Sequence, residues 1–225
     1  MTANVIKALE KIKESALFED ELFFVGGTAL SYYMNHRISE DIDIICAKAL
    51  NYKTIVPMIT SLGAVKIQDE NITALRMAGL FPDEYMLKFI IDNVKLEFFR
   101  ANRPIQKEIL QTATFTTYKD SKIKILDLKS ICKLKLVALL QRNKSRDLFD
   151  FIAILNGEVL TVEEMLDITF KTSNIKSVKE LYTFIESKEE PLNDETVYLS
   201  EKDSINLLFN EIKNESLLKL KKLIT

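Results

Sequence analysis

Two neighbouring stretches decide the fold, FVGGTAL at residues 24–30 and RISEDIDI at residues 37–44. The first predicts a strand, a tight loop and a helix start, because an apolar run of strand length ends at Gly26 and Gly27. Glycine lets the backbone approach a ligand without a Cβ in the way, and Thr28 is placed to cap the helix that follows. Unpaired N–H groups at a helix start attract anions, so this loop is a candidate phosphate seat.

The second stretch predicts a short strand whose side chains alternate between two faces. Asp41 and Asp43 share one face, with Cα atoms about 6.5–7 Å apart. Carboxylates at that spacing can bind one divalent cation or a pair about 3.5–4 Å apart. Taken alone, a Gly-Gly pair is often only a turn, and an Asp-x-Asp strand is often only a solvated face. Together they predict a phosphate-binding site and a metal-binding site in one segment.

The composition is that of an ordinary folded protein. The 225 residues suffice for one large domain or two small ones, and 47% are hydrophobic and 28% charged. No apolar run reaches about 18 residues, so we expect no membrane-spanning helix and no membrane partner. Residues 1–13 carry charges throughout an amphipathic pattern that is unlike a signal peptide, which predicts a cytoplasmic protein. The net charge of −2 does not favour nucleic acid.

The metal-ligand inventory restricts the cofactor. With one histidine and two cysteines, no zinc site of the usual kind can form. Any metal must be held by oxygen, which points to Mg²⁺ or Mn²⁺. Cys46 and Cys132 lie in apolar contexts and are expected to be buried free thiols.

Hydrophobic periodicity divides the chain near residue 120. A helix is expected over residues 4–15, and a helix over 51–62 is expected to be interrupted by Pro57. The expected strands are 65–68, 73–77, 85–91, 94–99, 113–118 and 123–126, with a helix at 103–112. The expected later helices are 128–142, 146–155, 162–170, 177–187, 202–213 and 215–224. We therefore expect a sheet-containing domain over 1–120 and a helical domain over 121–225.

A lone acid stands out in the run VKLEFF at residues 94–99. Burying a carboxylate there is expensive unless something pairs with it. Glu97 is therefore either on the wet face of an edge strand or a third metal ligand beside Asp41 and Asp43. Asp92 is a rival, although its place at the expected hairpin turn explains an Asp by itself.

The one strongly basic stretch runs from Lys119 to Arg146, with nine Lys or Arg against two acids. Lys135 and Arg142 lie two turns apart on one helical face. The stretch is either a solvated face, with Arg146 and Asp150 paired at i, i+4, or a clamp for triphosphate and a track for nucleic acid.

As a set, these motifs resemble a known family. The order of the Gly-Gly helix start and the Asp-x-Asp strand resembles the DNA polymerase β-like nucleotidyltransferases. Gly-Gly-Thr-Ala-Leu followed by Arg-x-Ser-x-Asp-x-Asp is more narrowly similar to the AbiEii/AbiGii toxin family. The run from Lys135 to Arg142, followed by Arg146-Asp147-x-x-Asp150, looks like that family's second signature. The resemblance covers about residues 20–155.

The resemblance implies an α+β fold, with a polymerase β-like nucleotidyltransferase domain (a small mixed sheet with flanking helices) before a helical domain. The active site is expected in the cleft between them. Asp41, Asp43 and Glu97 would hold two Mg²⁺ ions, and Glu97 could help deprotonate the acceptor. Glu97 departs from the family pattern, in which Asp is commoner.

The resemblance also assigns binding roles. Gly26, Gly27 and Thr28 would receive the phosphates of an NTP. A lysine and an aspartate of the helical region join the site in this family. By position they are Lys135, with Lys133 as the register alternative, and Asp147 or Asp150. The remaining candidates are Ser39, which orders the turn, Arg37, which contacts phosphate or pairs with Glu40, and the basic residues Arg142 and Arg146.

The implied function is transfer of a nucleotidyl group from an NTP to an acceptor, with a tRNA-like RNA as the first candidate. The setting would be a toxin–antitoxin or phage-defence system with a cognate antitoxin. Two alternatives stay open: adenylylation of a protein hydroxyl, and a non-catalytic nucleotide-binding module. A nuclease is a remoter one, because the Gly-Gly helix start argues against it.

Overall fold

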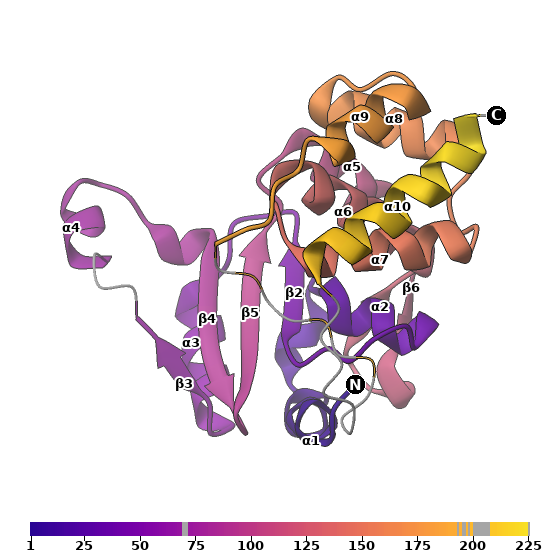
Figure 1. Cartoon of the computed structure of the whole chain (residues 1–225). Helices are drawn as coiled ribbons and strands as arrows, with labels where there is room; N and C mark the ends of the chain where they lie inside the picture. Colours follow the sequence, from indigo (N-terminus) through magenta and orange to yellow (C-terminus); the bar gives the residue numbers. More distant parts are fainter. Residues whose placement is uncertain (69–71, 193, 195–196, 198, 200–207, 225) are drawn as a thin grey trace. The chain divides into compact units, whose positions relative to one another are not determined.

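The chain is described by a computed structural model that covers residues 1–68, 72–192, 194, 197, 199 and 208–224. It forms two compact units. The first consists of Met1–Tyr32 and Ser39–Asp127, and the second of Tyr33–Ile38 and Leu128–Thr225 (Figure 1). The chain therefore enters the second unit briefly at residues 33–38, returns to the first, and leaves it again after Asp127.

A seven-stranded mixed sheet organises the described part of the first unit, in the order β3-β4-β5-β2-β1-β7-β6 (Figure 1). The strands are β1 (Phe23–Val25), β2 (Ile42–Cys46), β3 (Val65–Ile67), β4 (Met86–Ile91), β5 (Val94–Arg100), β6 (Phe115–Thr117) and β7 (Lys124–Leu126). The pairs β2–β5 and β1–β7 are parallel, and the other neighbours are antiparallel. The expectation of an α+β fold with a mixed sheet is confirmed.

Strand alternation gives this sheet two different faces. On β4 and β5, Leu87, Phe89, Leu96 and Phe98 are buried, and the rings of Phe89 and Phe98 meet edge to face with centroids 6.0 Å apart. The side chains between them, such as Lys88 and Glu97, point to the opposite face, which is only partly covered. The candidate residue Glu97 therefore lies on the more open face.

The helices of the first unit follow from amphipathic stripes. They are α1 (Ala3–Ile12), α2 (Gly26–Met34), α3 (Tyr52–Ser61), α4 (Ile72–Met77) and α5 (Pro104–Thr112), with short 3₁₀ turns η1 (Ala16–Glu19), η2 (Pro82–Glu84) and η3 (Tyr118–Asp120). In α1, Val5, Leu9 and Ile12 share one buried stripe, and the helix contacts β5. The core of this unit lies between such stripes and the apolar face of the sheet.

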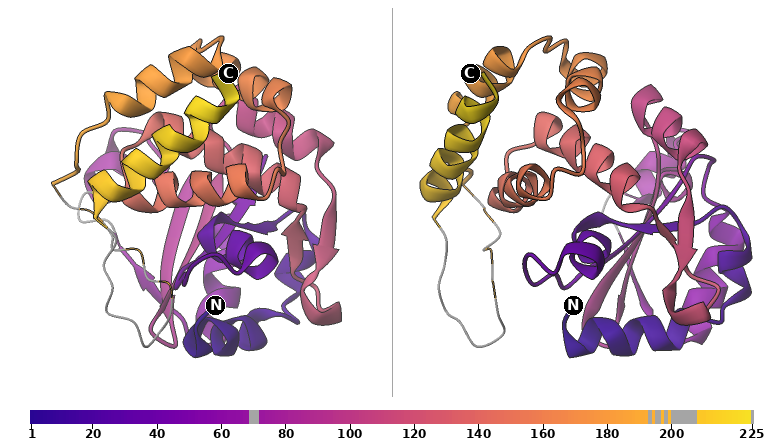
Figure 2. Two further views of the ribbon diagram at one scale, coloured as in Figure 1. Left: turned by 45° about the vertical axis from the view of Figure 1, so that its right-hand side comes forward. Right: turned by 90° about the vertical axis from the view of Figure 1, so that its right-hand side faces the viewer.

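The second unit is helical over its described residues. It contains α6 (Leu128–Gln141), α7 (Ser145–Asn156), α8 (Val162–Ser173), α9 (Val178–Glu186) and α10 (Phe209–Ile224). Helix α6 packs on α7 and α8, while α10 packs on α7 and α9 (Figure 2). Thr161 and Glu164 form a capping box at the start of α8, which satisfies two backbone N–H groups. Each described helix of the chain is too short or too polar to cross a bilayer.

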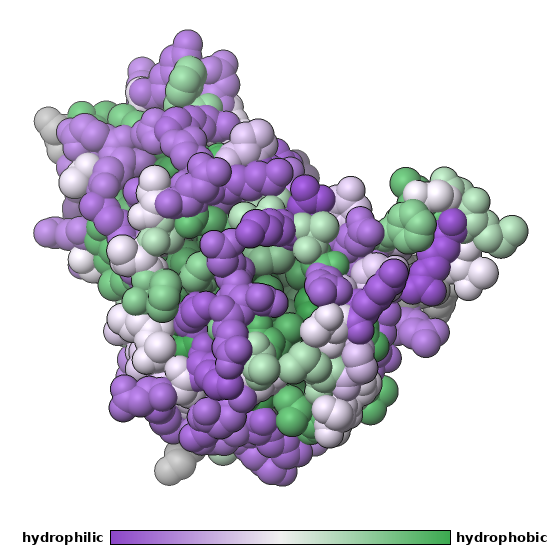
Figure 3. Space-filling view, turned by 180° about the vertical axis from the view of Figure 1, so that it is seen from behind, coloured by the Kyte–Doolittle hydropathy of each residue, from purple (hydrophilic) through white to green (hydrophobic). Residues whose placement is uncertain are grey.

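Some expected elements are wrong. Residues 73–77 form helix α4 rather than a strand, because Ala, Leu, Arg and Met are strong helix formers and this stretch makes no strand pairing. Apolar residues of this stretch are exposed, among them Met77 at 86%, and the lobe at the right of Figure 3 is partly green. Because these apolar residues are not confined to one buried side of the helix, their spacing in the sequence resembles that of a strand.

Two other expectations changed in detail. Helix α3 continues through Pro57, which lies on its exposed side, where water can replace the missing hydrogen bond. The two expected C-terminal helices form one helix, α10, and residues 200–207 lie outside the described residues. Cys46 and Cys132 are buried free thiols, as expected.

Candidate active site

The glycine loop and the start of α2 coincide. Helix α2 begins at Gly26, directly after β1, so the expectation that Thr28 caps it is wrong. Gly26 has a φ of +78°, a backbone conformation that side chains rarely adopt, and this lets the chain turn from strand to helix within one residue. Thr28 lies in the first turn instead.

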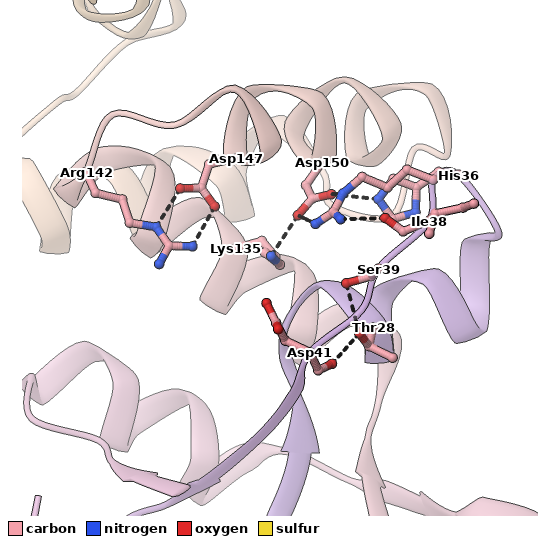
Figure 4. A network of polar contacts seen from close by, with 10 residues as sticks. Thr28, His36, Ile38, Ser39, Asp41, Lys135, Arg142, Asp147 and Asp150 are labelled. Carbon is pink, nitrogen blue, oxygen red and sulfur yellow. Dashed lines mark hydrogen bonds and ion pairs between the residues drawn. The ribbon is translucent and has the colours of Figure 1, made fainter. Parts of the chain in front are cut away.

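Thr28 joins the helix to the approach of β2. Its hydroxyl lies 2.8 Å from Ser39 Oγ and donates to the backbone carbonyl of Asp41 (Figure 4). Thr28 and Ser39 are both buried. These contacts fix the backbone immediately before Asp43, so the two sequence stretches lie together. We refer to the start of α2 together with Asp41, Asp43 and Glu97 as the acidic corner.

Asp43 lies against the first residue of α2. Asp43 is the cross-strand partner of Val25, and a Cβ placed on Gly26 would lie only 2.7 Å from Asp43 Cγ. Glycine is therefore required here by space as well as by its φ. The arrangement puts a carboxylate beside the positive end of a helix, the place where an anion is stabilised.

Glu97 enters this corner through the strand register. Asp43 on β2 pairs with Glu97 on β5, and Glu97 pairs with Lys88 on β4. Adjacent strands are about 4.8 Å apart, so these three side chains form a row across one face of the sheet. Strand β5 lies between β4 and β2, so the interpretation of Glu97 as an edge-strand residue is wrong.

Two lysines surround the Glu97 carboxylate. Lys95 Nζ is 2.9 Å from Glu97 Oε1, and Lys88 Nζ is 3.7 Å from the same oxygen. Burial lowers the pKa of Lys95, but the hydrogen bond to Glu97 and the charges of Glu97, Asp41 and Asp43 outweigh burial and raise it. All three acids therefore act on one ammonium group.

The rival acid has a different role. Asp92 occupies the hairpin turn between β4 and β5 with a φ of +49° and pairs with Lys7 and Lys11 on α1. These contacts tie α1 to the turn and account for Asp92 without a metal.

In the second unit, Asp150 is a buried hub for three basic side chains. Its Oδ1 accepts from Arg37 Nε at 2.7 Å and from His36 Nε2 at 2.7 Å (Figure 4). Its Oδ2 accepts from Arg37 Nη2 at 3.1 Å and lies 2.7 Å from Lys135 Nζ. Burial alone would raise the pKa of Asp150, but Lys135, Arg37 and His36 hold it well below its usual range.

This hub revises the expected roles of the basic residues. Arg37 is 5% exposed and held by Asp150, an arrangement that neither sequence interpretation of Arg37 included. Lys135 is buried beside Asp150, whereas Lys133 acts on Glu164, so Lys135 is the lysine of the hub. Which of the two lysines acts in the active site stays a prediction.

A second acid of α7 is paired separately. Arg142 donates through Nε to Asp147 Oδ2 at 2.6 Å and through Nη2 to Asp147 Oδ1 at 2.9 Å (Figure 4). Asp147 is 2% exposed, while the side chain of Arg142 is half exposed. Arg146 is half-buried in the first turn of α7.

The structure therefore groups the candidates by unit. Gly26, Gly27, Thr28, Ser39, Asp41, Asp43 and Glu97 lie in the first unit, and Arg37, Lys133, Lys135, Arg142, Arg146 and Asp147 lie in the second. The sequence interpretation missed Lys88, Lys95 and His36. Lys95 had a visible signal, since residues 95 and 97 of a strand share a face.

The donor set of the corner fits a hard divalent cation. Its three acids supply only oxygen, the ligand atom that Mg²⁺ and Mn²⁺ prefer. Among the described residues, no three His, Cys, Asp or Glu side chains are already arranged to hold a metal ion. Glu97 is engaged by Lys95 through Oε1, so a metal ion bound at Glu97 would compete with Lys95 for the negative charge of that carboxylate.

Comparison with known proteins gives the family. The profile of the nucleotidyl transferase AbiEii toxins of type IV toxin–antitoxin systems matches residues 7–216. This chain belongs to the AbiEii toxin family. The match covers most of the chain, so the resemblance seen in the two signatures is confirmed, and the protein is a nucleotidyltransferase of the toxin class.

Proteins similar to this AbiEii chain are found by sequence, and solved structures with a similar fold are found by structure. An uncharacterized protein from Aquifex aeolicus is 26% identical over 201 residues, covering 87% of this chain and 88% of the relative. A candidate nucleotidyltransferase from H. pylori aligns with a TM-score of 0.54 at 18% identity, covering 99% of this chain and 96% of that one. MenT4, a nucleotidyltransferase toxin from Mycobacterium tuberculosis, aligns with a TM-score of 0.56 at 13% identity, covering 98% and 82%.

Proposed function

We propose that this AbiEii protein transfers a nucleoside monophosphate from an NTP to an acceptor hydroxyl and that it requires Mg²⁺ or Mn²⁺. The observation that supports this most directly is the position of Asp43. It lies against Gly26 at the start of α2 and is paired in register with Glu97. The helix start that we propose to bind phosphate therefore lies beside carboxylates that can bind a cation. Transfer of a nucleotidyl group from a triphosphate needs both groups close together.

The residues of the corner have distinct roles in this proposal. Backbone N–H groups at Gly26 and Gly27 receive phosphate oxygens. Asp41 and Asp43 bind the cation, which when present neutralises the charge that develops during in-line displacement at the α-phosphorus. Glu97 completes the ligand set or accepts the proton of the attacking hydroxyl.

The contacts behind the corner make it rigid. Thr28 and Ser39 hold the backbone at Asp41, so the two aspartates keep a fixed spacing. Preorganised ligands reduce the cost of ordering the site when the nucleotide binds. The action of Lys135 on the triphosphate stays a prediction of the family resemblance.

An RNA with a tRNA-like end is the proposed acceptor, and a cognate antitoxin is the proposed protein partner. Both come from membership of a toxin family rather than from a surface of this chain. MenT4 is itself a nucleotidyltransferase toxin, which supports the toxin setting.

The test is incubation of the protein with each labelled NTP, Mg²⁺ and total RNA. Label on a discrete RNA band, absent with Asp43→Asn and retained with Asp20→Asn, is expected. Asp20 is an exposed acid of the same unit and serves as the matched control. Label on protein instead of RNA would mean that the acceptor is a protein. The absence of both labelled product and pyrophosphate with every NTP would contradict the proposed activity.

A further inference from the structure

Two acids lie side by side on neighbouring strands of the sheet. Asp43 and Glu97 are register partners on parallel strands, and like charges in this relation destabilise a sheet unless a cation lies between or beside them. The side chain of Glu97 is 16% exposed, so water screens this repulsion poorly. A compensating cation is therefore part of the fold.

Lys95 is the nearer of the two lysines that supply such a cation to Glu97. Its ammonium is within hydrogen-bond distance of Glu97, at 2.9 Å, and also interacts with the charges of Asp41 and Asp43. Lys88 is the cross-strand partner of Glu97, but its ammonium stays 3.7 Å away. The two lysines thus differ in their distance from the same carboxylate, so substitutions at Lys88 can serve as the control for substitutions at Lys95.

A lysine in this place opposes the binding of a metal. The carboxylate that would complete the ligand set is already engaged by Lys95 through Oε1, so a cation must compete with the ammonium group for its charge. An ammonium near three carboxylates also lowers the electrostatic attraction that a divalent ion would feel.

We propose that Lys95 is a built-in counter-ion, held by Glu97 in the metal-free protein and displaced when a divalent cation binds to Asp41 and Asp43. The inference rests on the proposed function, because it takes these aspartates as metal ligands. Lys95 is then a positioning residue that sets the metal affinity of the site. The triphosphate of an incoming nucleotide offers the displaced ammonium a new anionic partner, so metal binding and nucleotide binding favour each other.

The experiment is titration of the purified protein with Mn²⁺, followed by the electron paramagnetic resonance signal of the free ion. Lys95→Met is expected to bind Mn²⁺ about two- to fivefold more tightly than the wild type, the range that a partly exposed ion pair supplies. Lys95→Arg should bind like the wild type, and Lys88→Met should show a smaller increase. Lys48→Met, which removes a lysine with an 84% exposed side chain paired to Glu21, should leave the affinity unchanged.

Thermal unfolding supplies a second readout. In the presence of a chelator, Lys95→Met should melt at a lower temperature than the wild type, because the repulsion between Asp43 and Glu97 is then less compensated. Adding Mn²⁺ should raise its melting temperature more than that of the wild type. If Lys95→Met does not fold, Lys95→Gln removes the same charge and keeps a hydrogen-bond donor.

The outcomes separate the two proposals. If the wild type binds Mn²⁺ and Asp43→Asn abolishes that binding, but Lys95→Met binds no more tightly, the counter-ion inference is overturned and the proposed function stands. If the wild type binds no Mn²⁺, or Asp43→Asn binds it equally well, the metal assignment and the counter-ion inference fall together.

Discussion

The two units of this protein treat an aspartate in opposite ways. Asp150 in the second unit is fully buried, and its two oxygens are bound by Arg37, His36 and Lys135. Asp43 in the first unit lies against a glycine, next to another acid on a more open face of the sheet. A buried carboxylate surrounded by cations is costly to remove, because the cations lose their charged partner, whereas two adjacent carboxylates cost stability unless a cation such as Lys95 or a metal ion compensates them.

The comparison distinguishes an aspartate with bound basic partners from an aspartate placed beside a second acid. The buried hub has every sign of a positioning device, since Arg37 meets both oxygens of Asp150 in a planar fork. The acidic corner has the signs of a binding site, since its like charges call for a cation. Substitutions at the two places should therefore alter different measurable quantities.

The largest expected effect comes from breaking the hub. Asp150→Asn removes the charge that Arg37 and Lys135 bind in the interior, so the free energy of unfolding should fall by about 3–5 kcal/mol. Denaturant unfolding monitored by circular dichroism measures this. Glu158→Gln, an exposed acid just after α7, is the control. Stability within about 1 kcal/mol of the wild type would contradict the hub.

Breaking the corner should affect catalysis rather than stability. Asp43→Asn, and likewise Asp41→Asn, should reduce nucleotidyl transfer at least about 100-fold, because the cation loses a charged ligand. The melting temperature without metal should stay level or rise, since one of two adjacent like charges is removed. A variant that kept wild-type transfer, or lost its fold, would refute this division of roles.

The space above Gly26 sharpens the same point. Gly26→Ala introduces a Cβ that overlaps Asp43 and an unfavourable φ, so the protein should lose about 1–3 kcal/mol of unfolding free energy. Transfer should fall as well, because Asp43 is pushed from its place. Gly63→Ala is the matched control, with a φ of +90° and nothing within 4 Å of the added Cβ. Equal losses in the two variants would mean that the contact with Asp43 is unimportant.

The smallest expected effect is a pH dependence of the hub. The folded-state pKa of Asp150 is depressed, so its stabilisation is complete above the unfolded-state pKa of about 3.9 and is lost as the pH falls toward the lower folded value. The stability difference between wild type and Asp150→Asn should be constant near neutral pH and should narrow below about pH 4. Unfolding curves at several pH values measure it, and a difference that grew on acidification would reverse the assigned direction.

The sequence predicted the parts that local chemistry determines. The Gly-Gly helix start, the alternation of Asp41 and Asp43, and the hairpin at Asp92 follow from spacing and turn preferences. The helix at 72–77 was missed because apolar residues such as Met77 are exposed. Their spacing in the sequence therefore does not mark one buried side of a helix. The capping position was misplaced by three residues, because Gly26 makes the strand-to-helix turn alone and the helix begins there.

The long-range pairings could not be predicted. Arg37 and Asp150 are 113 positions apart in the chain, and nothing local indicates that they meet. Lys95 lies two residues from Glu97 and was visible, yet spacing alone does not distinguish a solvated lysine from a counter-ion. The strand order that puts β5 beside β2 supplied this distinction.

The order of the strands has a consequence for how the chain is made. Strand β1 lies between β2 and β7, and Phe24 pairs with both Ile44 and Ile125. A growing polypeptide cannot complete this sheet before residue 126 has left the ribosome, and Arg37 must wait for Asp150 as well. A truncated product that ends at Asp127 would hold all three acids of the corner but would lack Asp150, the acid that binds Arg37. Both units are therefore completed only by residues that come late in the chain.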